Sequence, residues 1–162
     1  MTLLPVLIAQ TLIALMTGFP DPQSAVPGDF ALRLKFGVCT TDVIDTFKGE
    51  YVRDLGMGRT VSAPVSISNT QTAELYGLVT QTSFFDYPSI FQPQGNSFHE
   101  PYERYNLEVR AANVTHSVTW NDAEASGAPD AQRLRELLRR VIQMFRDMPP
   151  VQSLPRPEVI CV

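Results

Sequence analysis

The stretch YNLEVRAANVTHSVTWND, residues 105–122, alternates apolar and polar side chains on both sides of a short turn. Because successive side chains of a β-strand point to opposite faces, this alternation predicts two half-buried strands. We expect them over Tyr102–Ala111 and Val114–Asn121. Ala112 and Asn113 form the expected turn, since asparagine tolerates a positive φ. The stretch therefore predicts an antiparallel hairpin with one apolar face.

The chain before this hairpin repeats the pattern. Phe30–Val38 places its apolar side chains on one face and predicts a strand. Asp45–Asp54 and Thr60–Ile67 predict two more strands. Pro64 lies inside the last of these, which indicates an edge strand or a bulge because proline cannot donate a hydrogen bond to a neighbouring strand.

Two further segments have helical spacing. Ser68 stands three residues before Gln71, the spacing of a capping box, and the helix that it begins is expected to end near Ser83. Apolar residues at i, i+3, i+4 and i+7 from Leu134 onward predict a second amphipathic helix. We expect this helix to begin at residue 129 or 130 and to end before Pro149.

The element order strand-strand-strand-helix-strand-strand-helix predicts an α+β fold. We expect a single antiparallel sheet of about five strands, with both amphipathic helices on one face. The other face is expected to be solvated, because it carries Arg33, Lys35, Lys48, Glu50, Thr115 and Thr119.

Composition and charge exclude some classes of function. The chain has 162 residues, and its apolar share of 44% is ordinary for one globular domain. The net charge of −4 does not supply the positive field that a phosphate backbone demands, so we expect no nucleic-acid binding. We expect no cofactor. The basic residues of the last helix are expected to form a solvated face, with binding to an anionic partner or a lipid surface as the alternative: Arg133, Arg135, Arg139, Arg140 and Arg146.

The amino-terminal segment indicates export. Leu3–Met16 contains no charged residue, and Gln10 and Thr11 are its only polar ones. Such a run is too short for a bilayer-spanning helix of about 20 residues and is typical of a secretory signal peptide. We expect residues 1–25 to be a signal peptide and linker, residues 26–162 to be one α+β domain, and the mature protein to be periplasmic or secreted. An uncleaved membrane anchor and a buried first helix are the alternatives.

The chain has two cysteines, Cys39 and Cys161. An even count in an exported protein suggests one disulfide. Because the loop that it closes is very long, chain-entropy arithmetic assigns it about 4–5 kcal/mol. Two unrelated thiols are the alternative.

Two groups of residues could carry catalysis. His99 and Glu100 begin like a zincin motif, but the second histidine of that motif is missing and Pro101 prevents the helix. A metal site built from His99, Glu100 and His116 is the alternative that would make the protein a metal-dependent hydrolase. The second group is acidic and is expected to be a solvated surface: Asp42, Asp45, Glu50 and Asp54.

A long loop, Phe84–Tyr102, is rich in aromatic residues. Exposed aromatic side chains on such a loop are typical contact anchors. The alternative is a loop folded down as a satellite core. The expected partner-binding residues are Tyr87, Phe91, Phe98, His99 and Tyr102.

Three stretches support a comparison with known proteins. They are TAELYGLVTQTSFFDYPS (residues 72–89), residues 105–122 quoted above, and APDAQRLRELLRRVI (residues 128–142). Together they resemble a pattern in small exported bacterial proteins of unknown function. In the order of elements they are similar to emfourin-type inhibitors of thermolysin-like metalloproteases, and this resemblance implies protease inhibition.

The sequence as a whole predicts a non-enzymatic exported domain. Its expected partner is an unknown protein or envelope component, which would make it a protease inhibitor or an envelope protein. The alternatives are the metal-dependent hydrolase and a membrane-tethered structural module. Contact with a membrane is expected only if the amino-terminal segment stays uncleaved.

Overall fold

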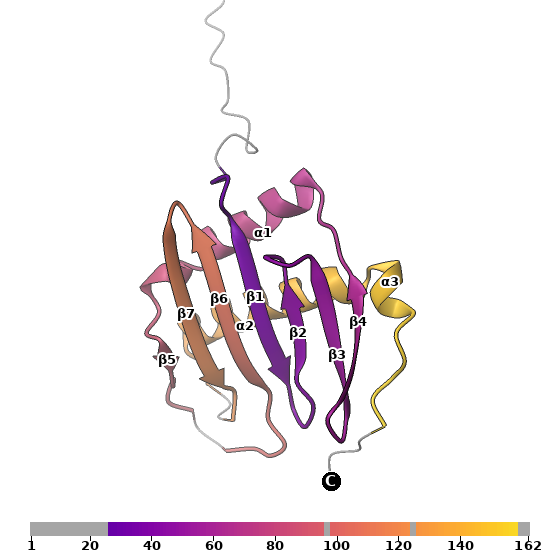
Figure 1. The fold of residues 1–162 in the computed structure, drawn as a ribbon. Helices are drawn as coiled ribbons and strands as arrows, with labels where there is room; N and C mark the ends of the chain where they lie inside the picture. Colours follow the sequence, from indigo (N-terminus) through magenta and orange to yellow (C-terminus); the bar gives the residue numbers. More distant parts are fainter. Residues whose placement is uncertain (1–25, 96–97, 124–125, 159–162) are drawn as a thin grey trace, which may run out of the picture.

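The computed structural model describes residues 26–95, 98–123 and 126–158, which form a 7-stranded sheet and its covering helices (Figure 1). The strands lie across the sheet in the order β4-β3-β2-β1-β6-β7-β5. The strands are β1 (Ala31–Gly37), β2 (Asp42–Asp45), β3 (Glu50–Gly56), β4 (Arg59–Pro64), β5 (Ile90–Phe91), β6 (Arg104–Ala111) and β7 (Val114–Asn121). The helices are α1 (Asn69–Gln81), α2 (Pro129–Arg146) and α3 (Pro149–Gln152), and a short 3₁₀ turn, η2 (Phe84–Asp86), follows α1.

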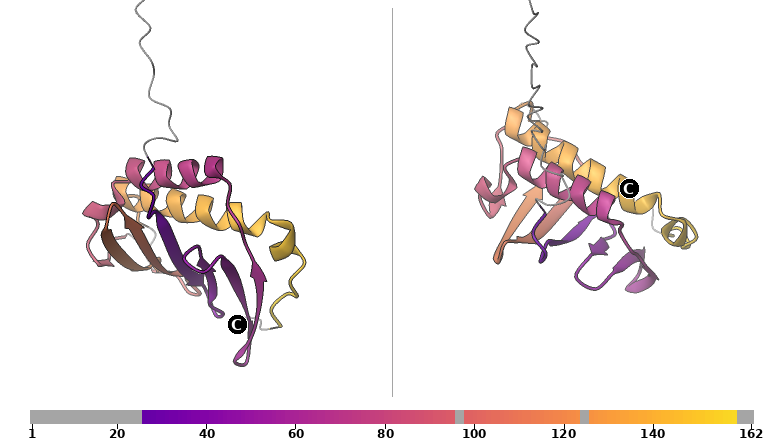
Figure 2. Two further views of the ribbon diagram at one scale, coloured as in Figure 1. Left: turned by 45° about the horizontal axis from the view of Figure 1, so that its top comes forward. Right: turned by 90° about the horizontal axis from the view of Figure 1, so that it is seen from above.

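The two long helices, α1 and α2, lie side by side on one face of the sheet (Figure 2). The predicted α+β class is therefore confirmed. Three details of the prediction were wrong. The sheet has 7 strands rather than about five, it is mixed because β5 pairs parallel to β7, and α3 is a third helix.

The core lies between the sheet and the two long helices. β1 runs through the middle of the sheet, and its Leu32, Leu34 and Phe36 are buried as the alternation predicts. Leu34 lies opposite Ile44 of β2 and Leu107 of β6, which are also buried. Each large apolar side chain removed from water in this way contributes about 1.5–3 kcal/mol. The buried face of α2 covers this layer with Leu134, Leu137, Leu138, Val141 and Phe145.

The strand expected over Asp45–Asp54 is two strands, β2 and β3, joined by a tight turn. The carboxylate of Asp45 accepts a hydrogen bond from the N–H of Lys48 at 3.1 Å, and Gly49 has a φ of 69°. An aspartate that bonds to the backbone of its own turn and a glycine at positive φ are both typical of turns. The alternating pattern of residues 45–54 therefore spans the end of β2, a turn and the start of β3 rather than a single strand.

The edges of the sheet differ. Pro64 ends β4, which lies at one edge as the proline indicates. At the other edge β5 has only 2 residues, and Ile90 lies opposite Thr119 in parallel pairing. The N–H of Thr119 donates to the carbonyl of Ser89 at 2.8 Å. A strand this short leaves no periodicity in the sequence, which is why it was not predicted.

The predicted hairpin is confirmed. β6 and β7 pair antiparallel along their whole length, and Ala112 and Asn113 form the turn with φ values of 52° and 64°. The carboxylate of Asp29 accepts hydrogen bonds from both of these backbone N–H groups at 2.8 Å. These bonds lower the pKa of Asp29 because they favour its charged form. The turn is thereby tied to the segment that precedes β1.

The helix ends follow the sequence signals. Ser68 caps α1, and its hydroxyl and the side chain of Gln71 make both hydrogen bonds of the capping box. α2 ends at Arg146, and Asp147 is its C-cap residue. Pro149 then begins α3, since a proline at the first helical position lacks only a donor that would be unpaired in any case.

Some predictions concern residues outside the described part of the chain. The signal peptide and linker, residues 1–25, lie outside it. So does Cys161, and the disulfide with Cys39 therefore stays a prediction. Within residues 26–95, 98–123 and 126–158, no helix is both long and apolar enough to cross a bilayer.

Candidate functional site

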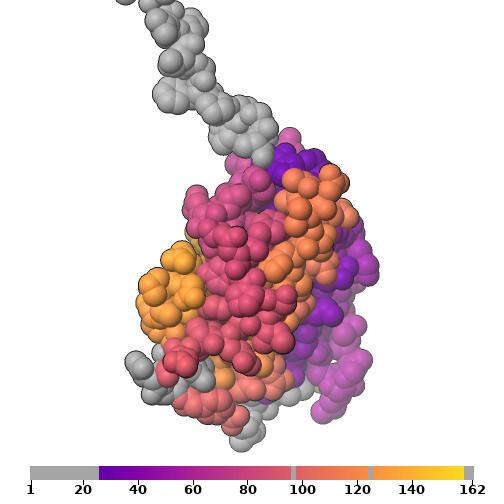
Figure 3. Space-filling view, turned by 90° about the vertical axis from the view of Figure 1, so that its left-hand side faces the viewer, coloured from indigo at the N-terminus to yellow at the C-terminus, as the bar shows by residue number. Residues whose placement is uncertain are grey.

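The aromatic loop begins by packing down on the sheet edge. After α1 the chain runs beside β7, as seen from that side of the molecule in Figure 3. Tyr87 and Phe91 are only 8% and 5% exposed. Their rings meet at a centroid distance of 5.1 Å, and Phe91 meets Trp120 at 5.5 Å. The hydroxyl of Tyr87 donates to the carbonyl of Asp130 in α2 at 2.7 Å. These two side chains belong to the core and are not available as exposed anchors.

The later part of the loop is different, because it exposes an aromatic ring. Phe98 is 65% exposed, and its ring meets the ring of Tyr102 edge-on at 6.1 Å. The guanidinium of Arg104 lies 5.3 Å from the centre of the Tyr102 ring, a distance typical of a cation–π contact. We call Phe98, Tyr102 and Arg104 the aromatic ridge.

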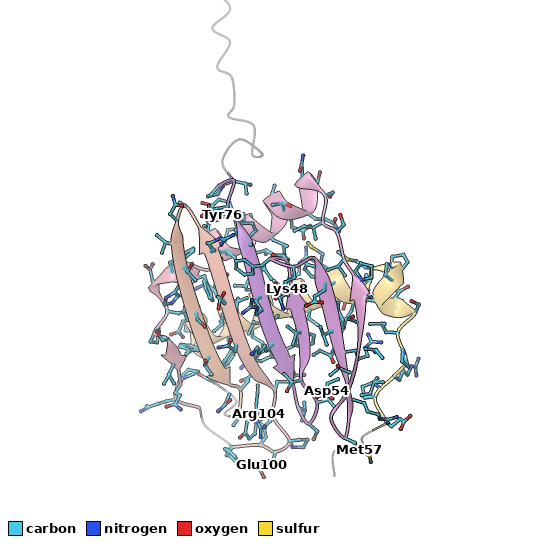
Figure 4. All side chains as sticks on the ribbon, viewed as in Figure 1. Lys48, Asp54, Met57, Tyr76, Glu100 and Arg104 are labelled. Atoms are coloured by element: carbon cyan, nitrogen blue, oxygen red, sulfur yellow. The ribbon has the colours of Figure 1, made fainter. Side chains whose placement is uncertain are left out.

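Two clefts flank this ridge and share Tyr102 as their common wall. One has a volume of about 390 Å³ and is lined in part by Pro93, Phe98 and Trp120. The other has a volume of about 370 Å³ and lies beside Cys39 and Glu100. Glu100 and Arg104 both lie at the end of the sheet where β1 finishes and β6 begins (Figure 4). The ridge and its clefts therefore occupy one end of the domain.

Helix α2 holds the ridge in place through Asp122. Both carboxylate oxygens of Asp122 accept hydrogen bonds at 2.8 Å from Arg135, whose pKa this contact raises. The N–H of Asp122 donates to the carbonyl of Glu103, and the N–H of His99 donates to that of Ala123, both at 2.9 Å. The loop is thus tied at two points to a segment that α2 anchors. Arg135 was expected on a solvated face, and its pairing with a residue 13 positions away left no signal in the sequence.

The three residues of the alternative metal site do not come together. His99 and Glu100 are exposed in the loop. His116 is half-buried in β7, where its Nε2 lies 2.8 Å from the carbonyl oxygen of Tyr87 and its ring meets that of Phe84 at 5.6 Å. A carbonyl only accepts, so Nε2 carries a proton in that contact. Across the described ranges, no group of three or more His, Cys, Asp or Glu side chains could hold a metal ion.

The acidic residues near β2 are not all solvated, which corrects the expectation for Asp42 and Asp45. Asp42 is 8% exposed, and its carboxylate accepts the Tyr51 hydroxyl at 2.6 Å and the N–H of Asp54 at 3.1 Å. Asp45 is also buried and accepts from Arg33 at 2.9 Å. Burial and the hydrogen bond to Asp42 raise the pKa of Tyr51. These carboxylates tie β2 to its neighbours.

The uncovered face of the sheet is polar, as predicted. Lys35, Thr115 and Thr119 are exposed on it. Phe47 lies in the turn between β2 and β3. Its ring sits 5.6 Å from the guanidinium of Arg33 and 4.9 Å from that of Arg110. Lys48 of the same turn lies in front of the sheet in Figure 4. This turn therefore shields part of the sheet face that lies opposite the helices.

The chain matches no family model, and no curated protein is significantly similar to it. The resemblance to emfourin-type inhibitors therefore remains a prediction.

Proposed function

We propose that the protein is an exported, non-enzymatic binding domain and that the aromatic ridge is its binding surface. The exposure of Phe98 beside one cleft, next to the Tyr102 wall that this cleft shares with a second, is the observation that carries this proposal. Large aromatic side chains beside pockets are typical of the few residues that supply most of the affinity at protein interfaces. Tyr102 contributes a second ring to the same surface. His99 follows Phe98 directly along the loop.

The anchoring of the ridge supports binding rather than a loose surface loop. Two backbone hydrogen bonds at 2.9 Å and the bidentate Asp122–Arg135 pair order the loop before any partner arrives. A surface that is already ordered pays less conformational entropy when it binds. The arrangement thus favours affinity at a modest interface area.

The surroundings of the ridge indicate the chemistry of the partner. Each cleft is large enough for one or two side chains of a partner. Glu100 is exposed at the rim of one cleft and has no ion-pair partner among the described residues. We propose that the partner presents an extended polypeptide segment, with an apolar side chain that enters a cleft and a basic side chain that faces Glu100. A protease or another envelope protein could supply such a segment.

The position of the ridge is compatible with either fate of the amino-terminal segment. The described chain starts at Val26, just before β1, and the ridge clefts lie beyond the other end of β1, next to Val38. A strand of 7 residues spans about 23 Å. A protein that keeps its amino-terminal segment as a membrane anchor would therefore present the ridge away from the attachment point.

Site-specific photocrosslinking in cells tests the proposal. A photoreactive residue at Phe98 is expected to capture a defined polypeptide of the envelope fraction. The same residue at Met57, which is 87% exposed on the turn between β3 and β4, serves as the matched control and is expected not to capture it. Equal capture at both positions, or capture at neither, contradicts the assignment of the ridge.

A further inference from the structure

Three arginines from distant parts of the sequence converge on a cleft that the ridge does not use. The cleft has a volume of about 650 Å³ and lies between the sheet, the end of α2 and the segment after α3. Arg53 comes from β3, Arg146 from the last turn of α2 and Arg156 from the carboxyl-terminal segment. Asp42 is the acidic residue of its lining, so the lining carries a net charge of +2 in a chain whose net charge is −4.

Among the residues that the structure describes, no carboxylate neutralises the three guanidiniums. None of them forms an ion pair with a carboxylate of residues 26–95, 98–123 and 126–158, although Arg33, Arg59, Arg135, Arg139 and Arg140 all do. Asp42 is already engaged by the Tyr51 hydroxyl and the N–H of Asp54. Like charges gathered in a partly enclosed cleft repel one another, and a bound anion removes that cost.

Two of the arginines are held in position before any ligand binds. Arg53 donates to the carbonyls of Leu154 and Pro155 at 2.9 and 3.4 Å. The guanidinium of Arg146 lies 5.1 Å from the centre of the Phe36 ring. A role of Arg146 at the negative end of the α2 dipole would explain that residue alone and not its convergence with Arg53 and Arg156.

We propose that this cleft binds a phosphate group, either as the free ion or as the phosphate of a small polar ester. The planar fork of a guanidinium matches two oxygens of a phosphate, and a doubly charged group neutralises the net charge of the lining. Thr40 and Gln152 add polar groups to the same walls. The volume falls in the range of small-molecule sites and leaves room beyond one phosphate ion.

Thermal unfolding of the full chain with inorganic phosphate tests this proposal, with chloride at matched ionic strength as the reference. Phosphate is expected to raise Tm saturably, by roughly 5–10 °C at a hundredfold excess over Kd, whereas chloride does not. Arg156→Gln is expected to weaken phosphate binding about tenfold, because one charge-assisted contact is lost. A rise in Tm that chloride reproduces overturns the proposal.

Matched variants separate this site from general screening and from the ridge. Lys35→Gln removes the same charge from the uncovered sheet face and is expected to leave phosphate binding unchanged. Phe98→Ala is also expected to leave phosphate binding unchanged. The phosphate proposal can therefore be refuted without refuting the proposal that the ridge binds a partner. Equal phosphate affinity in Arg156→Gln, Lys35→Gln and the unaltered protein overturns the proposal. Tighter binding of glycerol 3-phosphate than of inorganic phosphate identifies the ester as the ligand, and equal binding identifies the free ion.

Discussion

Replacing Arg135 with glutamine is expected to loosen the aromatic ridge and to destabilise the domain. The substitution removes two hydrogen bonds of 2.8 Å to Asp122 and leaves that carboxylate without its cation. Removing one partner of a fully buried pair costs about 3–5 kcal/mol, whereas exposed pairs are worth about 0.2–1 kcal/mol. The Asp122 side chain is 12% exposed and that of Arg135 is 36% exposed, so solvent screens the pair in part. We expect a loss of about 1.5–3 kcal/mol in the free energy of unfolding.

Urea unfolding measures this loss as a fall in the midpoint concentration on the order of 1 M. Arg139→Gln is the matched control on the same helix. Its partner Glu136 is three residues away, and both side chains are more than half exposed, at 63% and 54%. We expect that variant to lose no more than about 0.5 kcal/mol.

Amide hydrogen exchange tests the link to the ridge separately from global stability. The N–H groups of His99 and Asp122 donate to backbone carbonyls within the segment that Arg135 anchors. They are expected to exchange about tenfold faster, or more, in Arg135→Gln and at an unchanged rate in Arg139→Gln. If both variants lose the same stability and both leave these amides unchanged, the reasoning about Asp122 and Arg135 is refuted.

Three further predictions follow from burial in the structure. Phe91→Ala is expected to cost about 3–5 kcal/mol because its ring is 5% exposed, whereas Phe98→Ala should change the unfolding free energy by less than about 0.5 kcal/mol; equal losses in urea would contradict this contrast. Tyr51→Phe removes a 2.6 Å hydrogen bond to the buried carboxylate of Asp42, and urea unfolding should show a loss of about 1.5–3 kcal/mol. Burial raises the pKa of Tyr51 and of Tyr105 above 10.0, so the stability that these groups contribute is complete below pH 10 and is lost as the pH rises further. Tm should therefore fall as the pH rises above about 10, less steeply in Tyr51→Phe, and a flat profile would rule this out.

Local patterns in the sequence predicted the elements whose signals are contained within a few residues. The alternation through residues 105–122 and the spacing of Ser68 and Gln71 both describe interactions between near neighbours. For these elements, the prediction agrees most closely with the structure. The turn between β2 and β3 was missed because its polar residues continue the alternation of the flanking strands.

The site depends on contacts between distant residues, which one sequence does not reveal. Phe91 and Phe98 lie in the same aromatic loop, yet only the Phe91 ring is buried, where it packs against Trp120. The burial of Asp42 depends on a hydrogen bond that the Tyr51 hydroxyl donates from β3. The anchoring of the ridge depends on Arg135 of α2. Each pairing is decided when strands and helices pack together, so a polar or aromatic residue type alone did not distinguish a core contact from a surface one.

The affinity of the partner captured at Phe98 is the most direct test of the ridge as the binding surface. With the partner purified, Kd is measured by calorimetry for the unaltered protein, for Phe98→Ala and for Met57→Ala. Loss of a central aromatic anchor is expected to weaken binding about 30-fold or more, and Met57→Ala is expected to leave Kd within about twofold. Equal Kd values for the unaltered protein and Phe98→Ala would contradict the ridge as the binding surface.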